Sequence, residues 1–283
     1  MTKAFCPGHI SCFFSPVRTA EVMTTGSVGA GIRLNKGCSV TLEERSDRNI
    51  RVTMDGIPAN ARITEHTIRS LAPGRGFDII IENELPVSQG MGMSAAGATA
   101  AGLCAASAAG REEYEAYKAA HIAEVTLGGG LGDVAGILGG RQPIRVKAGI
   151  QPYGRVIDSE LGMNITVAVL GPKMDTNTVL SDPAAVGRIA AAGIRCVDEF
   201  INTQTEKMLF SLSAEFSQSA GLETKEVKDA LSVLRKDHGA SMCMLGNSIF
   251  TNASEDEVRD LLGDVRSFSC SSSAEGPKLI RKA

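Results

Sequence analysis

The sequence predicts an α+β fold in two lobes, and three observations support this. An Ile-rich strand pattern at 77–85 leads through a glycine-bearing loop into an alanine-rich helix pattern. A new strand pattern opens the second half at 163–170, and three helical patterns follow it. Neither an internal repeat nor a low-complexity linker occurs. We place the boundary near Asp158 to Gly162, which divides the chain into lobes 1–158 and 159–283.

The first elements of the chain are interpreted as short strands joined by loops. Residues 4–6 form an apolar strand, and the Pro-Gly pair that follows predicts a turn over Pro7 to Ile10. Thr24 to Gly31 is rich in glycine. It is interpreted either as a flexible hairpin loop or as a substrate loop that presents Ser27 and backbone amides. The next elements expected are strands at 34–43 and 50–54, a turn at Asp55-Gly56, and helices at 65–71 and 111–127.

The loop between the Ile-rich strand and the alanine-rich helix is a candidate anion site. Gly90 and Gly92 allow backbone N–H groups to approach a ligand closely. Ser94 is a good N-cap for the helix that continues to Ala109, and the helix N-terminus adds partial positive charge. A phosphate is therefore the most suitable ligand. A plain tight turn explains the same pattern equally well.

Two other phosphate-binding patterns fit this loop less well. A Walker A loop would continue as Gly-Lys-Ser/Thr, and this one does not. The run from Gly90 to Ala95 fits a loose dinucleotide fingerprint, but Pro86 to Gln89 separate it from the strand. The acidic residues that follow, Glu112 and Glu113, open a helix instead of ending a second strand. A nicotinamide oxidoreductase is therefore a distant alternative.

Composition argues against several classes of partner. The chain has 283 residues, a formal net charge of −3 and no Trp, so we expect neither a nucleic-acid surface nor a membrane surface. No apolar run reaches transmembrane length, and the first residues do not resemble a signal peptide, so we expect a cytoplasmic protein. The seven cysteines are odd in number and lack a Cys-x-x-Cys pair, which favours reduced thiols over a zinc site.

A second informative run, 120–140, places two carboxylates beside a cluster of glycines. Glu124 lies on a predicted helix, and Asp133 would cap a short helix that begins at Val134. Alternatively, both serve phosphoryl transfer, because Mg²⁺ prefers oxygen ligands and a carboxylate near a hydroxyl can take its proton. Arg145 follows in an alternating strand. We select it for an anionic substrate, because Arg can hold a carboxylate through two hydrogen bonds.

Two stretches resemble motifs of the GHMP kinases, a superfamily of small-molecule kinases. Residues 86–96, Pro-x-x-x-Gly-Met-Gly-Met-Ser-Ala-Ala, are similar to the second motif, with Met91 and Met93 where Leu and Ser are usual. Residues 124–140 are similar to the stretch in which a Glu is followed by glycines, an Asp and a Gly-Gly pair. Both stretches occur in the order and at the spacing of the superfamily.

Two further stretches resemble the remaining motifs. Residues 7–10, Pro-Gly-His-Ile, are similar to the first motif, which lines the acceptor site in many members. His9 stands where Lys is common. Residues 238–250 are similar to the third motif, in which glycines are usual at the positions of Ser241 to Cys243.

The resemblance implies a GHMP kinase fold: an N-terminal lobe like domain 2 of ribosomal protein S5, and a C-terminal α/β sandwich of helices on an antiparallel sheet. It also implies that Mg²⁺ is held by Ser94 and Glu124, and that Asp133 activates the acceptor hydroxyl. The residues that it places at the ATP phosphates are Gly90, Met91, Gly92, Met93, Ser94 and Ala95.

Finer details resemble one branch, the pantoate kinases of archaea. These details are Pro-Gly-His-Ile followed by Phe-Phe-Ser-Pro, and Gly-Leu-Gly-Asp-Val around Asp133. That branch phosphorylates the primary hydroxyl of pantoate with ATP, toward coenzyme A. The resemblance makes Arg145, His9 and Ser27 the candidates for the acceptor site. The alternatives are a homoserine or shikimate kinase of the same superfamily and a catalytically inactive ligand-binding protein. A homodimer is compatible with the sequence.

Overall fold

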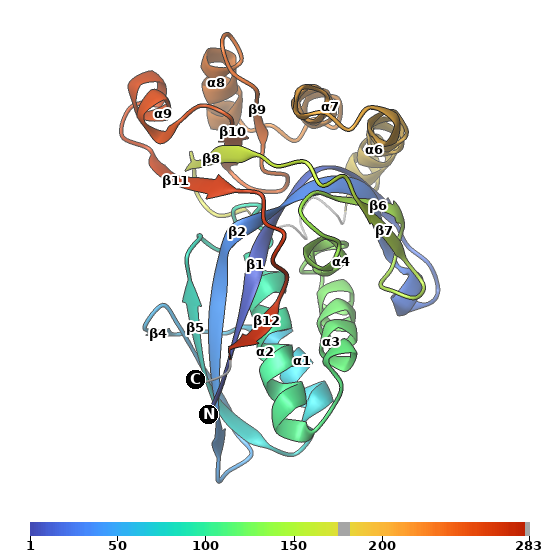
Figure 1. Ribbon diagram of the computed structural model, residues 1–283, viewed down its shortest axis with the longest axis vertical. Helices are drawn as coiled ribbons and strands as arrows, with labels where there is room; N and C mark the ends of the chain where they lie inside the picture. The colour runs from blue at the N-terminus through green and yellow to red at the C-terminus, as the bar shows by residue number, and fades with distance from the viewer. Residues whose placement is uncertain (175–181, 281–283) are drawn as a thin grey trace.

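The computed structural model describes residues 1–174 and 182–280 (Figure 1). The first part of the chain contains β1 (Thr2–Val17), η1 (Val22–Thr24), β2 (Gly26–Arg45), β3 (Ile50–Met54), β4 (Ile57–Pro58), α1 (Arg62–Leu71), β5 (Gly76–Asn83), α2 (Met93–Ala109), α3 (Glu113–Thr126), α4 (Asp133–Leu138), β6 (Pro143–Lys147) and β7 (Arg155–Asp158). The second part contains β8 (Asn164–Val169), α6 (Pro183–Thr203), α7 (Glu206–Ser219), α8 (Lys225–Leu234), β9 (Ala240–Met242), β10 (Ser248–Thr251), α9 (Glu255–Leu262), β11 (Arg266–Ser271) and β12 (Lys278–Ile280).

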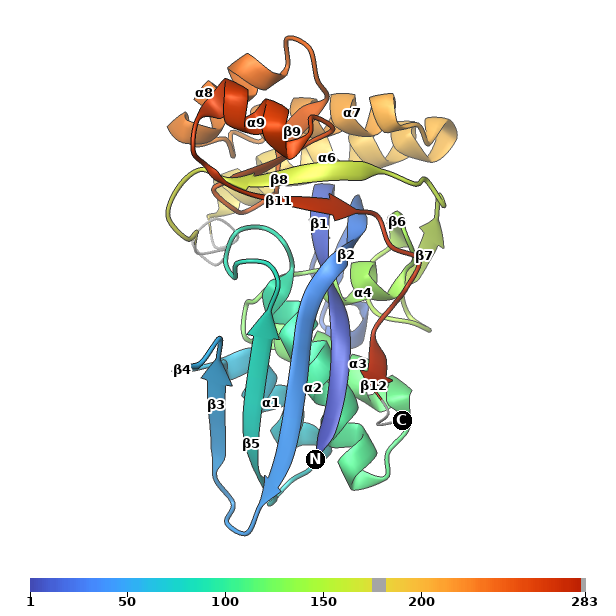
Figure 2. The ribbon, with the colours of Figure 1, turned by 60° about the vertical axis from the view of Figure 1, so that its left-hand side comes forward.

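The larger sheet has eight strands, and its main path runs β12-β1-β2-β5-β3-β4, with β6 paired to β2 and β7 to β6. All pairs are antiparallel except β3 with β5. Helices α1, α2 and α3 cover one face of this sheet (Figure 2). Most residues of α2 are buried, because the helix lies between the sheet and the other two helices. Its alanines and glycines allow that close packing on both sides.

The smaller sheet has four antiparallel strands in the order β11-β8-β10-β9, with helices α6 to α9 beyond it (Figure 1). The end of β1 extends into this region, where Phe13 packs against Phe200 and Phe14 against Phe216 with ring centroids 5.7 and 5.6 Å apart. The chain then returns, and β12 pairs with β1. The two sheets therefore share one hydrophobic core, and the boundary at residue 158 stays a prediction.

Two expectations about the N-terminal region are wrong. Residues 7–10 do not turn, because β1 continues through them with only a register irregularity between Pro7 and His9. The glycine-rich run belongs to strand β2, not to a loop. Its glycines provide space instead of flexibility: a Cβ on Gly31 would lie 2.3 Å from Nε2 of His9. In a sequence, a glycine that forms a turn cannot be distinguished from a glycine that lets another segment approach the backbone closely.

Both expected helix caps are also wrong. Helix α2 begins one residue before Ser94, after Gly92 in a left-handed conformation with φ of 62°. Asp133 is itself the first residue of α4, and its side chain makes no cap. The three helices of the second half and the helices expected at 65–71 and 111–127 are confirmed within a few residues. The strands expected at 4–6 and 34–43 are parts of the much longer strands β1 and β2. Helix α9 ends at Leu262, because Gly263 follows it with φ of 79°.

Candidate functional site

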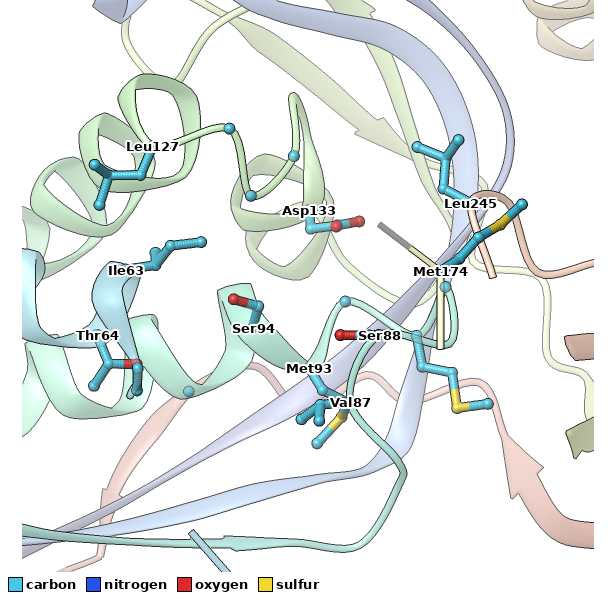
Figure 3. Close-up of a pocket in the computed structure, with 18 of the residues that line it drawn as sticks. Ile63, Thr64, Val87, Ser88, Met93, Ser94, Leu127, Asp133, Met174 and Leu245 are labelled. Atoms are coloured by element: carbon cyan, nitrogen blue, oxygen red, sulfur yellow. The ribbon is translucent and has the colours of Figure 1, made fainter. Parts of the chain in front are cut away.

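A cavity of about 690 Å³ lies beside the loop between β5 and α2 (Figure 3). Its walls come from the N-terminal end of α1, the loop before α2, the glycine-rich segment between α3 and α4, and the ends of β1 and β2. The residues after β8 and β9 complete it. Segments far apart in the sequence therefore meet here, including three of the four stretches that resemble kinase motifs. The fourth, residues 7–10, lies behind the wall, where His9 contacts Asp133.

The loop before α2 requires its glycines. Gly90 and Gly92 have φ of 73° and 62°, which L-residues with a side chain rarely adopt. A Cβ on Gly90 would lie 2.6 Å from the carbonyl oxygen of Cys243 and 2.7 Å from that of Met244. The turn after β9 therefore packs directly on the loop. This arrangement leaves the first N–H groups of α2 at the cavity, where they suit an anion.

Side chains of the loop divide between the core and the cavity. Met91 and Met93 are buried, although both also line the cavity. Ser94 is exposed and lies in the cavity wall in the first turn of α2 (Figure 3). Ala95 is buried and does not line the cavity.

Glu124 and Asp133 are joined by one hydrogen bond. Oε1 of the buried Glu124 accepts the backbone N–H of Asp133 at 2.9 Å. Its other oxygen, Oε2, has no hydrogen-bond partner among the described residues. Burial, followed by the charge of Asp133, raises the pKa of Glu124 from 4.5 to about 8. A cation bound at Oε2 would supply the missing partner and would lower the pKa of Glu124 toward its ordinary value.

Gly130 lies between these two carboxylates. A Cβ at this position would be 2.8 Å from Oε1 of Glu124 and 3.3 Å from Oδ2 of Asp133. The absence of a side chain therefore keeps open the space that the two acidic groups share.

The side chain of Asp133 lines the cavity, and one of its oxygens contacts a buried histidine behind the cavity wall. The Asp133 side chain is 26% exposed, and Oδ1 lies 2.9 Å from Nδ1 of the fully buried His9. A carboxylate in this position can face a hydroxyl group bound in the cavity.

Arg145 is a buried cation, and among the described residues it has no acidic hydrogen-bonding partner. Its Nη1 lies 3.4 Å from Nε2 of His9, and its Nη2 donates to Oγ of Ser11 at 3.4 Å. Within residues 1–174 and 182–280 it makes no salt bridge, and its Nε has no partner. Burial lowers its pKa, against the opposing charges of Asp133 and Glu124.

Ser27 lies next to this guanidinium. A Cβ on Gly132 would be 2.4 Å from Oγ of Ser27 and 3.0 Å from Nε of Arg145, so both groups face one small space. Ser27 lines the cavity. A hydroxyl beside an incompletely paired guanidinium suits a carboxylate ligand.

Comparison with known proteins identifies the family. Residues 61–141 match the family model described as the GHMP kinases N terminal domain. The chain is 32% identical to a pantoate kinase of Thermococcus kodakarensis, over 94% of this chain and 93% of the relative. The chain belongs to the pantoate kinase family of the GHMP kinases.

Solved structures agree with this family. A structure described as a phosphotransferase related to the coenzyme A biosynthesis pathway has a TM-score of 0.89 at 30% identity and covers 99% of this chain and 98% of its own. A homoserine kinase from Cytophaga hutchinsonii has a TM-score of 0.65 at 18% identity, with 99% of this chain and 97% of its own covered, and shows the fold alone. The GHMP kinase fold predicted from the sequence is confirmed.

The structure brings most of the candidate residues of this pantoate kinase family member together. Ser94, Asp133, Ser27 and the loop residues 90–93 line the cavity. Glu124, Arg145 and His9 lie behind its wall and contact residues that line it. Ser11 was missed in the sequence. Its alternation with His9 would have indicated it only if residues 7–10 had been recognised as strand.

The oxygen atoms at the cavity fit Mg²⁺ in the manner of kinases. No cluster of three or more His, Cys, Asp or Glu that could hold a metal occurs in the described part of the chain. Mg²⁺ in kinases usually takes one or two protein oxygens and completes its coordination with phosphates and water. Oε2 of Glu124, which has no partner among the described residues, and the hydroxyl of Ser94 are suitable ligands of this kind.

In residues 1–174 and 182–280, no helix is both long and apolar enough to cross a membrane.

Proposed function

We propose that this protein transfers the γ-phosphoryl group of ATP to the primary hydroxyl of pantoate and forms 4-phosphopantoate, an intermediate of coenzyme A synthesis. The observation that carries this proposal is the buried guanidinium of Arg145, which has no carboxylate partner among the described residues and faces the same space as Ser27. Pantoate supplies both the missing carboxylate and a hydroxyl group. The name and close similarity of the Thermococcus relative support the same substrate.

In this proposal each residue performs a step that its position allows. Arg145 and Ser27 bind the carboxylate of pantoate, and the N-terminal end of α2 with residues 90–94 holds the ATP phosphates. Asp133 takes the proton of the primary hydroxyl as the new O–P bond forms, and the bond to the β-phosphate breaks with release of ADP. Ser94 and Glu124 would hold Mg²⁺, which neutralises phosphate charge when it is bound.

Measurement of ADP release tests the proposal. The purified protein with Mg-ATP would be assayed in parallel with pantoate, homoserine, shikimate and mevalonate. We expect release with pantoate, and a phosphorylated product that phosphorus NMR assigns to the primary hydroxyl. If ADP is released with homoserine or shikimate but not with pantoate, that compound is the substrate and the proposal is wrong. If no acceptor causes ADP release, an inactive binding protein is favoured. The expected cytoplasmic location and homodimer stay predictions.

The contact with the carboxylate has its own test. We expect Arg145→Ala to raise the KM for pantoate much more than the KM for ATP, because the substrate loses its charged partner. Equal increases in both constants would indicate a general folding defect and would contradict the assigned contact.

A further inference from the structure

His9 is the buried titratable residue that the proposed steps do not use. It is fully buried near the middle of β1 and both of its ring nitrogens face protein groups, so direct contact with the acceptor, as expected from the sequence, is not what its position favours. Its ring instead contacts two groups that do have proposed roles: Asp133 through Nδ1 and Arg145 through Nε2.

These two contacts determine where the ring carries its hydrogen. A guanidinium has only donors, so Nε2 of His9 must accept from Nη1 of Arg145 at 3.4 Å. The hydrogen of a neutral imidazole then lies on Nδ1, which donates to Oδ1 of Asp133 at 2.9 Å. The positive charge of Arg145 beside Nε2 also disfavours the doubly protonated ring.

The neutral state agrees with the surroundings of the ring. The charged groups around it are Asp133 on α4, Arg145 on β6 and Arg33 on β2. Burial lowers the pKa of His9, the two arginines act in the same direction, and Asp133 opposes them without reversing the shift.

The ring packs closely against two glycines, and the backbone of His9 is hydrogen-bonded to the loop before α2. A Cβ on Gly31 would lie 2.3 Å from Nε2, and a Cβ on Gly136 would lie 2.5 Å from the same atom. The backbone N–H of His9 donates to the carbonyl oxygen of Met91 at 3.0 Å. One residue therefore contacts both the loop proposed for the ATP phosphates and the proposed base.

We propose that His9 is a positioning residue for Asp133: it donates Nδ1–H to the carboxylate, and Arg145 selects that tautomer. The donated hydrogen bond holds Oδ1 in place and leaves Oδ2 to accept the proton of the acceptor hydroxyl. This inference rests on the proposed function for its catalytic consequence, whereas the tautomer itself is a property of the protein without substrate.

Two substitutions of His9 by amide side chains distinguish the roles of the two ring nitrogens. The amide nitrogen of Asn takes the place of Nδ1, and that of Gln takes the place of Nε2. We expect His9→Asn to retain kcat within about tenfold of the wild type, because the hydrogen bond to the carboxylate is preserved. We expect His9→Gln to lose roughly 10- to 100-fold in kcat with little change in the KM for ATP. His66→Asn and His66→Gln, at an exposed histidine of α1, are the matched controls and should behave as wild type.

Nitrogen NMR of the histidine side chains supplies a second readout that does not depend on activity. We expect the signals that disappear in His9→Asn to be those of a neutral ring protonated at Nδ1. A ring protonated at Nε2, or at both nitrogens, would overturn the proposal. So would equal kcat values for the Asn and Gln variants, with both folded and both binding ATP. If the wild type phosphorylates no acceptor, the proposed function fails, while the NMR result still decides the tautomer.

Discussion

Glu124 uses its two carboxylate oxygens for different purposes. Oε1 accepts the backbone N–H of Asp133 and so holds the start of α4, while Oε2 is buried without a partner among the described residues. A metal ligand at Oε2 and the proposed base are therefore coupled through a single side chain. At the scale of residues, the site is a short series of contacts from Glu124 through Asp133 and His9 to Arg145.

The proposed base can be tested by one substitution. We expect Asp133→Asn to abolish turnover while ATP still binds, because the amide cannot take the proton of the hydroxyl. Steady-state kinetics and calorimetric titration with ATP would check the two halves of this prediction. Full activity in the variant would contradict the assignment.

The raised pKa of Glu124 predicts how stability depends on pH in the metal-free protein. The folded state keeps a proton on Glu124 up to about pH 8, whereas the unfolded chain releases it near 4.5. Between these values the folded state binds more protons, so the contribution of Glu124 to the free energy of unfolding falls as pH rises.

We expect Glu124→Gln, which keeps the shape and stays neutral, to remove that contribution. Urea unfolding of both proteins, measured without Mg²⁺ across this pH window, should show a smaller fall with rising pH in the variant than in the wild type. Parallel curves for the two proteins would mean that Glu124 is ionised throughout the window.

Elements in this molecule depend on positions without side chains. Strand β2 approaches β1 and the Arg145 side chain through Gly29 and Gly31, since a Cβ on Gly29 would lie 2.8 Å from Nη2 of Arg145. The segment between α3 and α4 uses Gly130 and Gly132 in the same way around the two carboxylates and Ser27. The glycines at these positions shape the site by leaving space.

This use of glycine is testable at Gly130. Its φ is not in the left-handed region, so Ala can adopt the backbone conformation, and the cost is steric. We expect Gly130→Ala to lower kcat at least about tenfold, because the new methyl group displaces the carboxylates. Gly187→Ala on α6, where nothing lies within 4 Å of the new Cβ, is the control and should leave kcat unchanged. Wild-type kcat in Gly130→Ala would contradict this account.

At the scale of the whole molecule, the C-terminal segment connects the smaller sheet back to the larger one. The chain leaves the smaller sheet at β11 and returns to pair β12 with β1 (Figure 2). Arg33, which is buried in β2, donates to the carbonyl oxygens of Ser273 and Ala274 in that returning segment. It also donates to the carbonyl oxygen of Ile137 at 2.9 Å, at the end of α4. One side chain therefore connects the returning segment with the element that carries Asp133.

We expect Arg33→Ala to reduce the free energy of unfolding by about 2 kcal/mol, because one buried and two partly buried carbonyl oxygens lose their donor. Urea unfolding would measure the loss. Arg259→Ala, which removes an exposed pair with Asp256, should leave stability nearly unchanged. A loss in Arg33→Ala no greater than in this control would show that the Arg33 side chain does not hold the returning segment.

Local patterns predicted much of the fold and most candidate residues. The three helices of the second half and the loop from Gly90 to Ser94 follow from periodicity and glycine placement, which act over a few neighbouring residues. The sequence also indicated Glu124, Asp133 and Arg145 as chemically suited residues. Predictions failed where one sequence pattern is compatible with two structures. The glycines of β2 are interpreted as a loop and Pro7-Gly8 as a turn, but both lie in strands.

Taken alone, the sequence determined the kinase resemblance, the types of residue available for chemistry and the run of most helices. Only the tertiary structure decided that His9 lies behind Asp133, that Arg145 has no carboxylate partner among the described residues, and that the turn after β9 packs on the phosphate loop. These facts depend on contacts between segments far apart in the chain. Which side chains meet there is set by how the two sheets and their helices pack, and no local pattern encodes it.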